Sequence, residues 1–133
     1  METTVRFLDG VKFEVEARGH KVICDQPRDN HGEDAGMTPP EFLLASLGTC
    51  AGFYAVQYLK ARSLPTNDLE VRVHAEKATQ PARLGSFVID VKTQVEDQRH
   101  REGLMRAVKS CLIHNTMLHA PAIEIRLESP VAA

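Results

Sequence analysis

The segment from residue 39 to residue 61 limits the possible folds of this chain more than any other feature. It begins with a helix-start pattern, in which Thr38 is the cap, Pro39 takes the first helical position and Glu41 stands three residues after the cap. The pattern predicts one long helix over residues 39–61. Its large side chains point to nearly every side, at Phe42, Leu43, Leu44, Leu47, Phe53, Tyr54, Val56 and Leu59. A helix that is apolar all round is a buried helix, so we expect it at the centre of the fold.

One narrow stripe of this predicted helix carries only small side chains. At about 100° per residue, the stripe consists of Ala45, Gly48, Thr49, Gly52 and Ala55. Each mid-helix glycine costs roughly 1 kcal/mol relative to alanine, so the close approach of another backbone is the expected reason for both. A chain of 133 residues has few elements that could wrap such a helix completely. We therefore expect a second copy of the chain, and hence a homodimer.

Composition and charge fit one domain that covers residues 1–133. The formal net charge is −2 and no basic patch is visible, so we expect no nucleic-acid partner. The start, METTVRFLDG, lacks the basic and apolar regions of a secretory signal. Polar residues interrupt the longest apolar stretch, so we expect no membrane span. These observations predict a cytoplasmic protein whose three cysteines stay reduced.

The remaining patterns predict strands on both sides of the long helix and a second helix after them. Residues 3–7 and 11–17 alternate around the turn pair Asp9-Gly10, and residues 20–24 form a third short strand before a loop at 25–40. Residues 68–78 and 86–96 read as paired strands, a helix starts at Gln98 after the cap Asp97, and residues 122–128 form a last strand. The predicted fold is α+β, with antiparallel sheet packed on a long buried helix.

Two of the three cysteines, Cys50 and Cys111, lie in apolar segments that are far apart in the chain, and Cys24 lies on a predicted strand. A buried thiol is often an inert small hydrophobic group, and this reading suits Cys50. Cys111 shares one face of the predicted second helix with Leu104, Ala107, Val108 and Asn115, and one helical turn with His114. An imidazole near a thiol can hold it as the reactive thiolate. Cys50, Cys111 and His114 could also be metal ligands, but no fourth ligand is apparent, so we expect neither a metal nor a cofactor.

The segments GMTPPEFLLASLGTCAG, CLIHNTML and IEIRLE, in this order and spacing, resemble the OsmC/Ohr superfamily over nearly the whole chain. The resemblance implies an intertwined homodimer with the cysteine-bearing helices at its centre. It also implies a peroxidase site, in which Cys50 attacks the peroxide, Cys111 resolves the product and Glu41 is the site carboxylate. The expected partners are a small hydrophobic hydroperoxide and a thiol or dithiol reductant.

Two residues depart from the peroxidase branch of that superfamily. That branch carries an arginine in the turn after the first strand, whereas this chain has Phe-Leu-Asp-Gly there, with Arg6 and Arg28 nearby in the sequence. Leu112 follows the second cysteine, where many peroxidases have proline. Both departures place the chain nearer to OsmC-like members without a defined activity.

Helix geometry separates Glu41 from Cys50. Nine residues correspond to about 13 Å of rise and half a turn of rotation, so the two side chains of one chain cannot touch. If Glu41 serves a site, we expect it to serve the Cys50 of the partner; its alternative role is the helix cap.

Two other function classes remain open. The chain could be a binding module that encloses an apolar pocket, with inert or sensing cysteines. It could also carry out acyl or thioester chemistry, although the sequence shows no dedicated base or oxyanion site.

Overall fold

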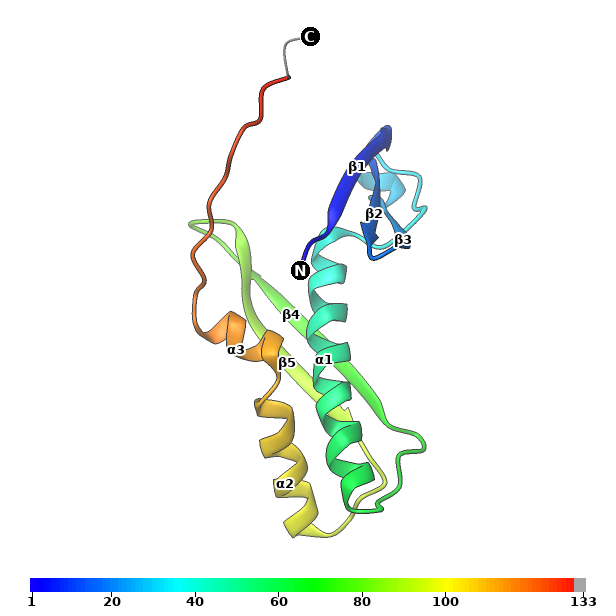
Figure 1. Cartoon of the computed structure of the whole chain (residues 1–133), viewed down its shortest axis with the longest axis vertical. Coiled ribbons are helices and arrows are strands. Elements are labelled where there is room, and N and C mark those ends of the chain that lie inside the picture. Colours follow the sequence, from blue (N-terminus) through cyan, green and yellow to red (C-terminus); the bar gives the residue numbers. More distant parts are fainter. Residues whose placement is uncertain (131–133) are drawn as a thin grey trace.

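The long helix predicted at residues 39–61 is α1 (Pro39–Ala61), and the rest of the fold is arranged around it (Figure 1). The computed structural model describes residues 1–130. The other elements are β1 (Thr4–Asp9), β2 (Lys12–Ala17), β3 (His20–Cys24), the 3-10 helix η1 (Arg28–Asn30), β4 (Glu70–Ala78), β5 (Arg83–Lys92), α2 (Gln98–Lys109) and α3 (Leu112–Leu118). The predicted α+β class with antiparallel strands is confirmed.

α1 starts as the sequence predicts. Thr38 is the N-cap in an extended conformation, Pro39 follows it, and Thr38 and Glu41 form a capping box. One side of the helix is buried, along Leu47, Ala51, Ala55 and Leu59, which repeat every four residues. Ala51, Ala55 and Leu59 share a core cluster with Val95, Leu104 and Val108. The expectation of a helix buried on all sides is wrong for the single chain, because Leu43 and Phe53 are exposed.

The small side chains of α1 face β4 of the same chain. A methyl group added at Gly48 would touch Val73, and one added at Gly52 would touch Val71. β4 of the same chain therefore makes the close approach that these two glycines permit. The prediction that a second copy of the chain packs on this stripe is wrong. Figure 1 shows the β4–β5 pair crossing α1, with α2 beside the same helix. The alternation of Val71 and Val73 on β4 supplies the apolar side of that contact.

By length and composition alone, α1 would be long enough and apolar enough to cross a membrane. The core helix of a soluble protein passes the same test, so this property is weak evidence for a membrane. The contacts of α1 with β4, α2 and α3 give it a place inside a protein fold.

The first three strands form a separate antiparallel sheet in the order β1-β2-β3. The turn between β1 and β2 passes through Gly10, whose φ of 54° lies in the left-handed region that glycine tolerates. One face carries the ion pairs of Arg6 with Glu14 and Glu16 and of Lys21 with Glu14. Register places the apolar side chains on the other face, at Val5, Phe7, Phe13, Val15, Val22 and Cys24. Several of these apolar side chains are exposed in the single chain.

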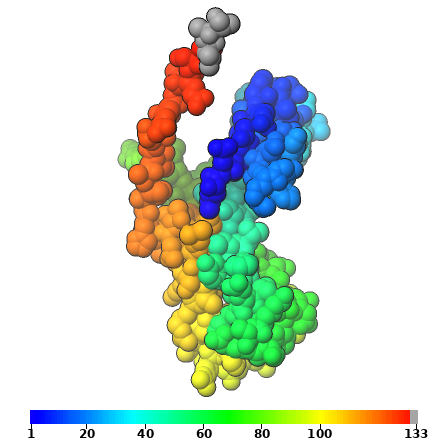
Figure 2. Space-filling model, viewed as in Figure 1, coloured from blue at the N-terminus to red at the C-terminus, as the bar shows by residue number. Residues whose placement is uncertain are grey.

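Two predictions for the C-terminal part are wrong. The helix that starts at Gln98 ends at Lys109, and Cys111 is the N-cap of the separate helix α3, so Cys111 and Asn115 do not continue the face of α2. The strand predicted at residues 122–128 is not formed, because no strand of the described residues 1–130 pairs with it. Ile123, Ile125 and Leu127 are 82%, 93% and 99% exposed. Figure 2 shows this segment and the N-terminal sheet as two separate projections from the body.

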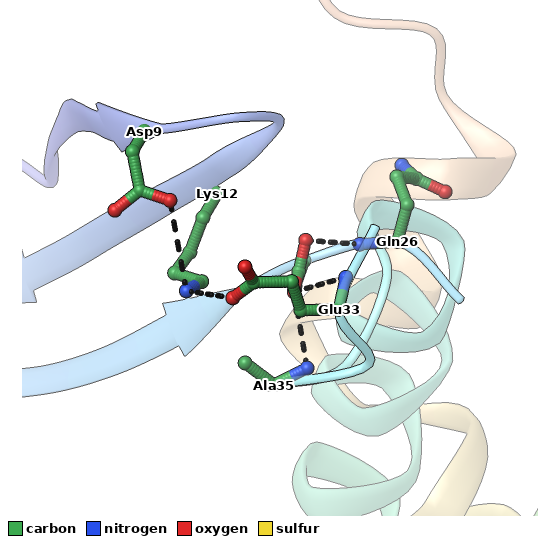
Figure 3. Close-up of polar contacts among 6 residues, drawn as sticks. Asp9, Lys12, Gln26, Glu33 and Ala35 are labelled. Atoms are coloured by element: carbon green, nitrogen blue, oxygen red, sulfur yellow. Dashed lines mark hydrogen bonds and ion pairs between the residues drawn. The ribbon is translucent and has the colours of Figure 1, made fainter. Parts of the chain in front are cut away.

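The loop between β3 and α1 is organised by the carboxylate of Asp25, which is only 1% exposed. The carboxylate accepts hydrogen bonds from the backbone nitrogens of Gln26 at 2.8 Å, Glu33 at 3.1 Å and Ala35 at 3.0 Å. Figure 3 shows these three nitrogens together with Lys12, whose ammonium group is 2.6 Å from a carboxylate oxygen of Glu33. The backbone hydrogen bonds, above all the one from Ala35, lower the pKa of Asp25. Asp25 thus holds both ends of the loop that leads into α1.

Replacing Asp25 by Asn should lower the melting temperature at neutral pH, since one amide oxygen cannot accept all three hydrogen bonds. The folded pKa of Asp25 is lowered, so its contribution to stability is fully present above the unfolded pKa of about 3.9 and is lost as the pH falls through the folded pKa. The difference in melting temperature between wild type and Asp25→Asn should therefore shrink on acidification from pH 7 to pH 3. Asp29→Asn, in the same loop and exposed, is the control and should change little. A difference that is constant across this pH range would contradict the assignment.

Candidate dithiol site

Cys50 and Cys111 are brought together by the packing of α3 on α1. Cys50 lies in the middle of α1 and is half-buried, while Cys111 is 0% exposed. A hydrogen-bonding interaction with Cys50 helps to raise the pKa of Cys111, so the two thiols are neighbours. Both cysteines are free thiols in this structure. The structure thus places two residues that are distant in the sequence at one site.

Burial is the main reason why the pKa of the Cys111 thiol lies above its usual range, and the hydrogen bond to Cys50 adds to it. The backbone N–H groups of His114 and Ile113 act in the opposite direction, because they stabilise a thiolate on Cys111. Burial prevails, so Cys111 is a protonated thiol near neutral pH. The two cysteines are therefore not equivalent: Cys50 is half-buried, and Cys111 is fully buried with a raised pKa.

The break between α2 and α3 creates the environment of Cys111. Ser110 ends α2, and Cys111 adopts an extended conformation with φ −57° and ψ 132°. The carbonyl of Cys111 accepts the N–H of Asn115 at 3.0 Å, which starts the new helix. The first N–H groups of a helix have no partner within it, so those of Ile113 and His114 are available to the sulfur at the N-cap. The sequence pattern does not reveal this break, because apolar spacing continues across it.

Glu41 lies at the start of α1 and is exposed. One of its carboxylate oxygens accepts the backbone N–H of Thr38 at 3.0 Å and the Thr38 hydroxyl at 2.8 Å. These hydrogen bonds lower the pKa of Glu41. Within the described part of the chain, the hydrogen bonds of the Glu41 side chain go to Thr38, so here Glu41 acts as a helix cap.

The other residues that the sequence singles out lie in different surroundings. Cys24 ends β3 next to Asp25, and burial raises its pKa. Arg6 donates to Glu16 at 2.9 Å on the charged face of the N-terminal sheet, and Arg28 lies in η1. His114 is the exception, because its Nδ1 is buried without a hydrogen-bond partner among the described residues. Within residues 1–130, no group of three His, Cys, Asp or Glu side chains is arranged to hold a metal ion.

Fold and site together define an α+β protein with a pair of interacting cysteines, one on the central helix and one at the N-cap of a short helix packed on it. The chain matches the family described as "OsmC-like protein" over residues 31–126, and it belongs to that family. This range includes both Cys50 and Cys111. No curated protein matches the chain.

Solved structures of related proteins share the fold. A protein from Psychrobacter arcticus assigned to osmotic stress induction and the detoxification response is 17% identical, with a TM-score of 0.78 over 86% of this chain and 85% of that one. An OsmC-like protein from Mycoplasma pneumoniae is 18% identical, with a TM-score of 0.72 over 90% and 87%. An organic hydroperoxide resistance protein from Legionella pneumophila is 16% identical, with a TM-score of 0.61 over 90% of both chains. At these identities the likeness shows the fold.

The contact between the two thiols predicts which disulfide forms on oxidation. A disulfide requires Cα atoms within about 7 Å, which the hydrogen-bonded pair favours. Mild oxidation followed by peptide mapping should yield a crosslink between Cys50 and Cys111 and leave Cys24 as a free thiol. The Cys24→Ser variant should oxidise like wild type. A crosslink that contains Cys24 would contradict the geometry.

Proposed function

We propose that this protein is a thiol-dependent organic hydroperoxide reductase that works as a cytoplasmic homodimer in defence against oxidative stress. The observation that carries the proposal is that α3 packs on α1 and so places the buried Cys111 thiol beside the half-buried Cys50 thiol, both of them free. Membership of the OsmC-like family supports it, as does the shared fold with the organic hydroperoxide resistance protein of Legionella pneumophila.

The chemistry uses the two cysteines in sequence. The Cys50 thiolate attacks the O–O bond of the hydroperoxide, an S–O bond forms, and the alkoxide leaves and takes a proton to become an alcohol. Cys50 is then a sulfenic acid. The sulfur of Cys111 attacks it, an S–S bond forms, and hydroxide leaves as water. An external thiol or dithiol reduces the disulfide and completes the cycle.

The surroundings of Cys50 support an apolar substrate. On α1, Leu47 and Phe53 each lie three residues from Cys50, just under one turn, so both lie near its side of the helix. A hollow of about 410 Å³ on the same helix, lined by Leu44, Ala45, Gly48, Thr49, Val71 and Val73, faces β4 and contains neither cysteine. The apolar side chains near Cys50 itself favour alkyl or aryl hydroperoxides over hydrogen peroxide.

The surface of the single chain supports a homodimer. The apolar face of the N-terminal sheet is exposed at Val5 and Phe7, α1 is exposed at Phe53, and residues 119–130 are exposed and lie outside any helix or strand. Exposed apolar surface on this scale is typical of an interface. An exposed segment with alternating Ile and Leu residues is suited to add to the edge of another strand, where its apolar side chains would be buried.

A second candidate is a sensing or binding module. It is favoured by the position of Arg6, which is engaged by Glu16 on the charged face of the N-terminal sheet and so does not assist a thiolate. In that case the dithiol pair would report oxidation without turning over peroxide.

Thiol titration with cumene hydroperoxide distinguishes the two functions. The reductase should lose two thiols per chain at a peroxide concentration equal to that of the chain, and Cys24→Ser should do the same. Cys50→Ser should lose none, and Cys111→Ser should lose one thiol and accumulate a sulfenic acid that dimedone traps. Wild type that keeps its thiols in the presence of excess peroxide would rule out the reductase.

The homodimer predicts a molar mass twice the 14.8 kDa of one chain in light scattering at micromolar concentration. Ile125→Asp should shift the protein towards monomer or towards aggregation, because the charge falls on the apolar side of the extended segment. Glu124→Gln, on the opposite side of that segment, is the matched control and should leave the dimer intact. A wild-type chain that is folded and monomeric under these conditions would exclude the homodimer.

If Glu41 serves the Cys50 of the partner, two inactive variants should complement each other. Random pairing of Glu41→Gln and Cys50→Ser chains makes about half of the dimers mixed, each with one intact site of two, so about a quarter of wild-type activity should return. Subunits must be exchanged by co-expression or refolding. Heterodimers that are proven to form and yet stay inactive would assign Glu41 to its helix-cap role alone.

A further inference from the structure

His114 carries a polar atom whose burial the fold does not explain. Its Nδ1 is inaccessible to solvent and has no hydrogen-bond partner within residues 1–130. Buried polar atoms are paired in most native structures, so an unpaired one indicates strain or a functional role. No other side-chain nitrogen or oxygen in the described part of the chain is in this state.

The position of His114 relates this atom to the two thiols. Cys111 is the N-cap of α3 and His114 is its third helical residue, and side chains at these two positions lie on the same side of the first turn. The free backbone N–H of His114 lies near enough to the Cys111 sulfur to lower its pKa, although the sulfur makes no cap hydrogen bond. α3 packs on α1, which carries Cys50. The side chain of His114 thus starts one helical turn from the buried thiol, and its Nδ1 forms no hydrogen bond with either sulfur in the reduced protein.

In the resolving step, the buried thiol of Cys111 must lose its proton. A thiolate is the nucleophile in thiol chemistry, yet Cys111 is buried, and this burial raises the pKa of its thiol. Once Cys50 is a sulfenic acid, the proton of Cys111 must leave before or during the attack. Glu41 is engaged by Thr38 at the exposed start of α1 and cannot take this proton within one chain.

We propose that His114 is the proton-transfer group of the resolving step. The neutral imidazole takes the proton of the Cys111 thiol while the Cys111 sulfur bonds to the Cys50 sulfur, and the imidazolium gives a proton to the departing hydroxide. One S–S bond forms, one S–O bond breaks, water leaves, and His114 returns to its neutral form. The inference rests on the proposed function and extends it to a residue that the two-cysteine scheme does not use.

The first experiment separates the two chemical steps in one sample. Cumene hydroperoxide is mixed with the reduced protein, and samples are trapped with dimedone over time and analysed by mass spectrometry. In His114→Asn, Cys50 should be oxidised within about twofold of the wild-type rate, while disulfide formation should slow by at least tenfold, a threshold set below the roughly 10²–10⁴-fold that general acid–base catalysis contributes. His119→Asn, at the exposed end of α3, is the matched control and should resolve at the wild-type rate.

The choice of asparagine distinguishes proton transfer from a structural role. Asn can supply a hydrogen-bonding group near the position of Nδ1 but cannot carry a proton between two sulfurs. A group that only satisfies a hydrogen bond would be replaced by Asn, and resolution would proceed at the wild-type rate. That result would overturn the proposal. Equal slowing of oxidation and of resolution would also overturn it, since the defect would then lie in the packing of α3. His114→Gln, which places its amide nearer to Nε2, should show the same selective loss.

The second experiment does not depend on peroxide chemistry. Cys50 of the Cys24→Ser protein is converted to the mixed disulfide with 5-thio-2-nitrobenzoate, and its release by Cys111 is followed by absorbance. Release still requires the Cys111 thiol to lose its proton, so His114→Asn should again slow it at least tenfold. If wild type fails to react with peroxide but shows this His114-dependent release, the reductase proposal fails and the role of His114 stands. Release at the wild-type rate from His114→Asn would overturn the role of His114.

Discussion

The packing of one side of α1 against β4 and α2 is the contact on which the rest of the structure depends. Gly48 and Gly52 let Val71 and Val73 come close to the helix backbone, and Leu59 anchors the other end in the core cluster. Burial of apolar side chains is the main favourable term in folding, and here it is concentrated on this one helix. With that side occupied, the turn of α1 that carries Cys50 remains available to α3. The core contact thus fixes where the thiols can meet.

The short interruption between α2 and α3 determines the chemical environment of Cys111. A continuous helix would hide its N–H groups in its own hydrogen bonds, and Cys111 would be an ordinary buried thiol. At an N-cap, the same sulfur faces the free N–H groups of Ile113 and His114. Burial raises the pKa of Cys111 and these donors lower it, so the thiol is kept protonated without being made inert. Such a balance fits the resolving role proposed for Cys111.

Local sequence patterns predict structural features that depend on residues adjacent in the sequence. They fail for features that depend on residues distant in the sequence. The capping box at Thr38, the Asp9-Gly10 turn and the cap at Asp97 are correctly predicted, since each is complete within a few residues. The end of α2 is not, because Ser110 carries none of the usual stop signals of glycine or proline. The role of Asp25 is invisible in the sequence, since its three donors are backbone groups. The strand expected at 122–128 has the right alternation but no neighbour in the single chain.

The surfaces that stay uncovered in one chain lie on the same elements that carry the two thiols, and this links assembly to chemistry. Phe53 on α1 is exposed less than one turn from Cys50, and Leu112 and Leu118 are exposed on α3. Dissolved thiols and excess peroxide react with a sulfenic acid in competition with the resolving cysteine. Resolution therefore works best where solvent is excluded. If a second copy covers these side chains, the same contact that completes the apolar core also closes the space around Cys50. One chain alone would then form the dithiol pair, while two chains would be needed to shield it from solvent. Loss of the interface would leave Cys50 reactive but exposed.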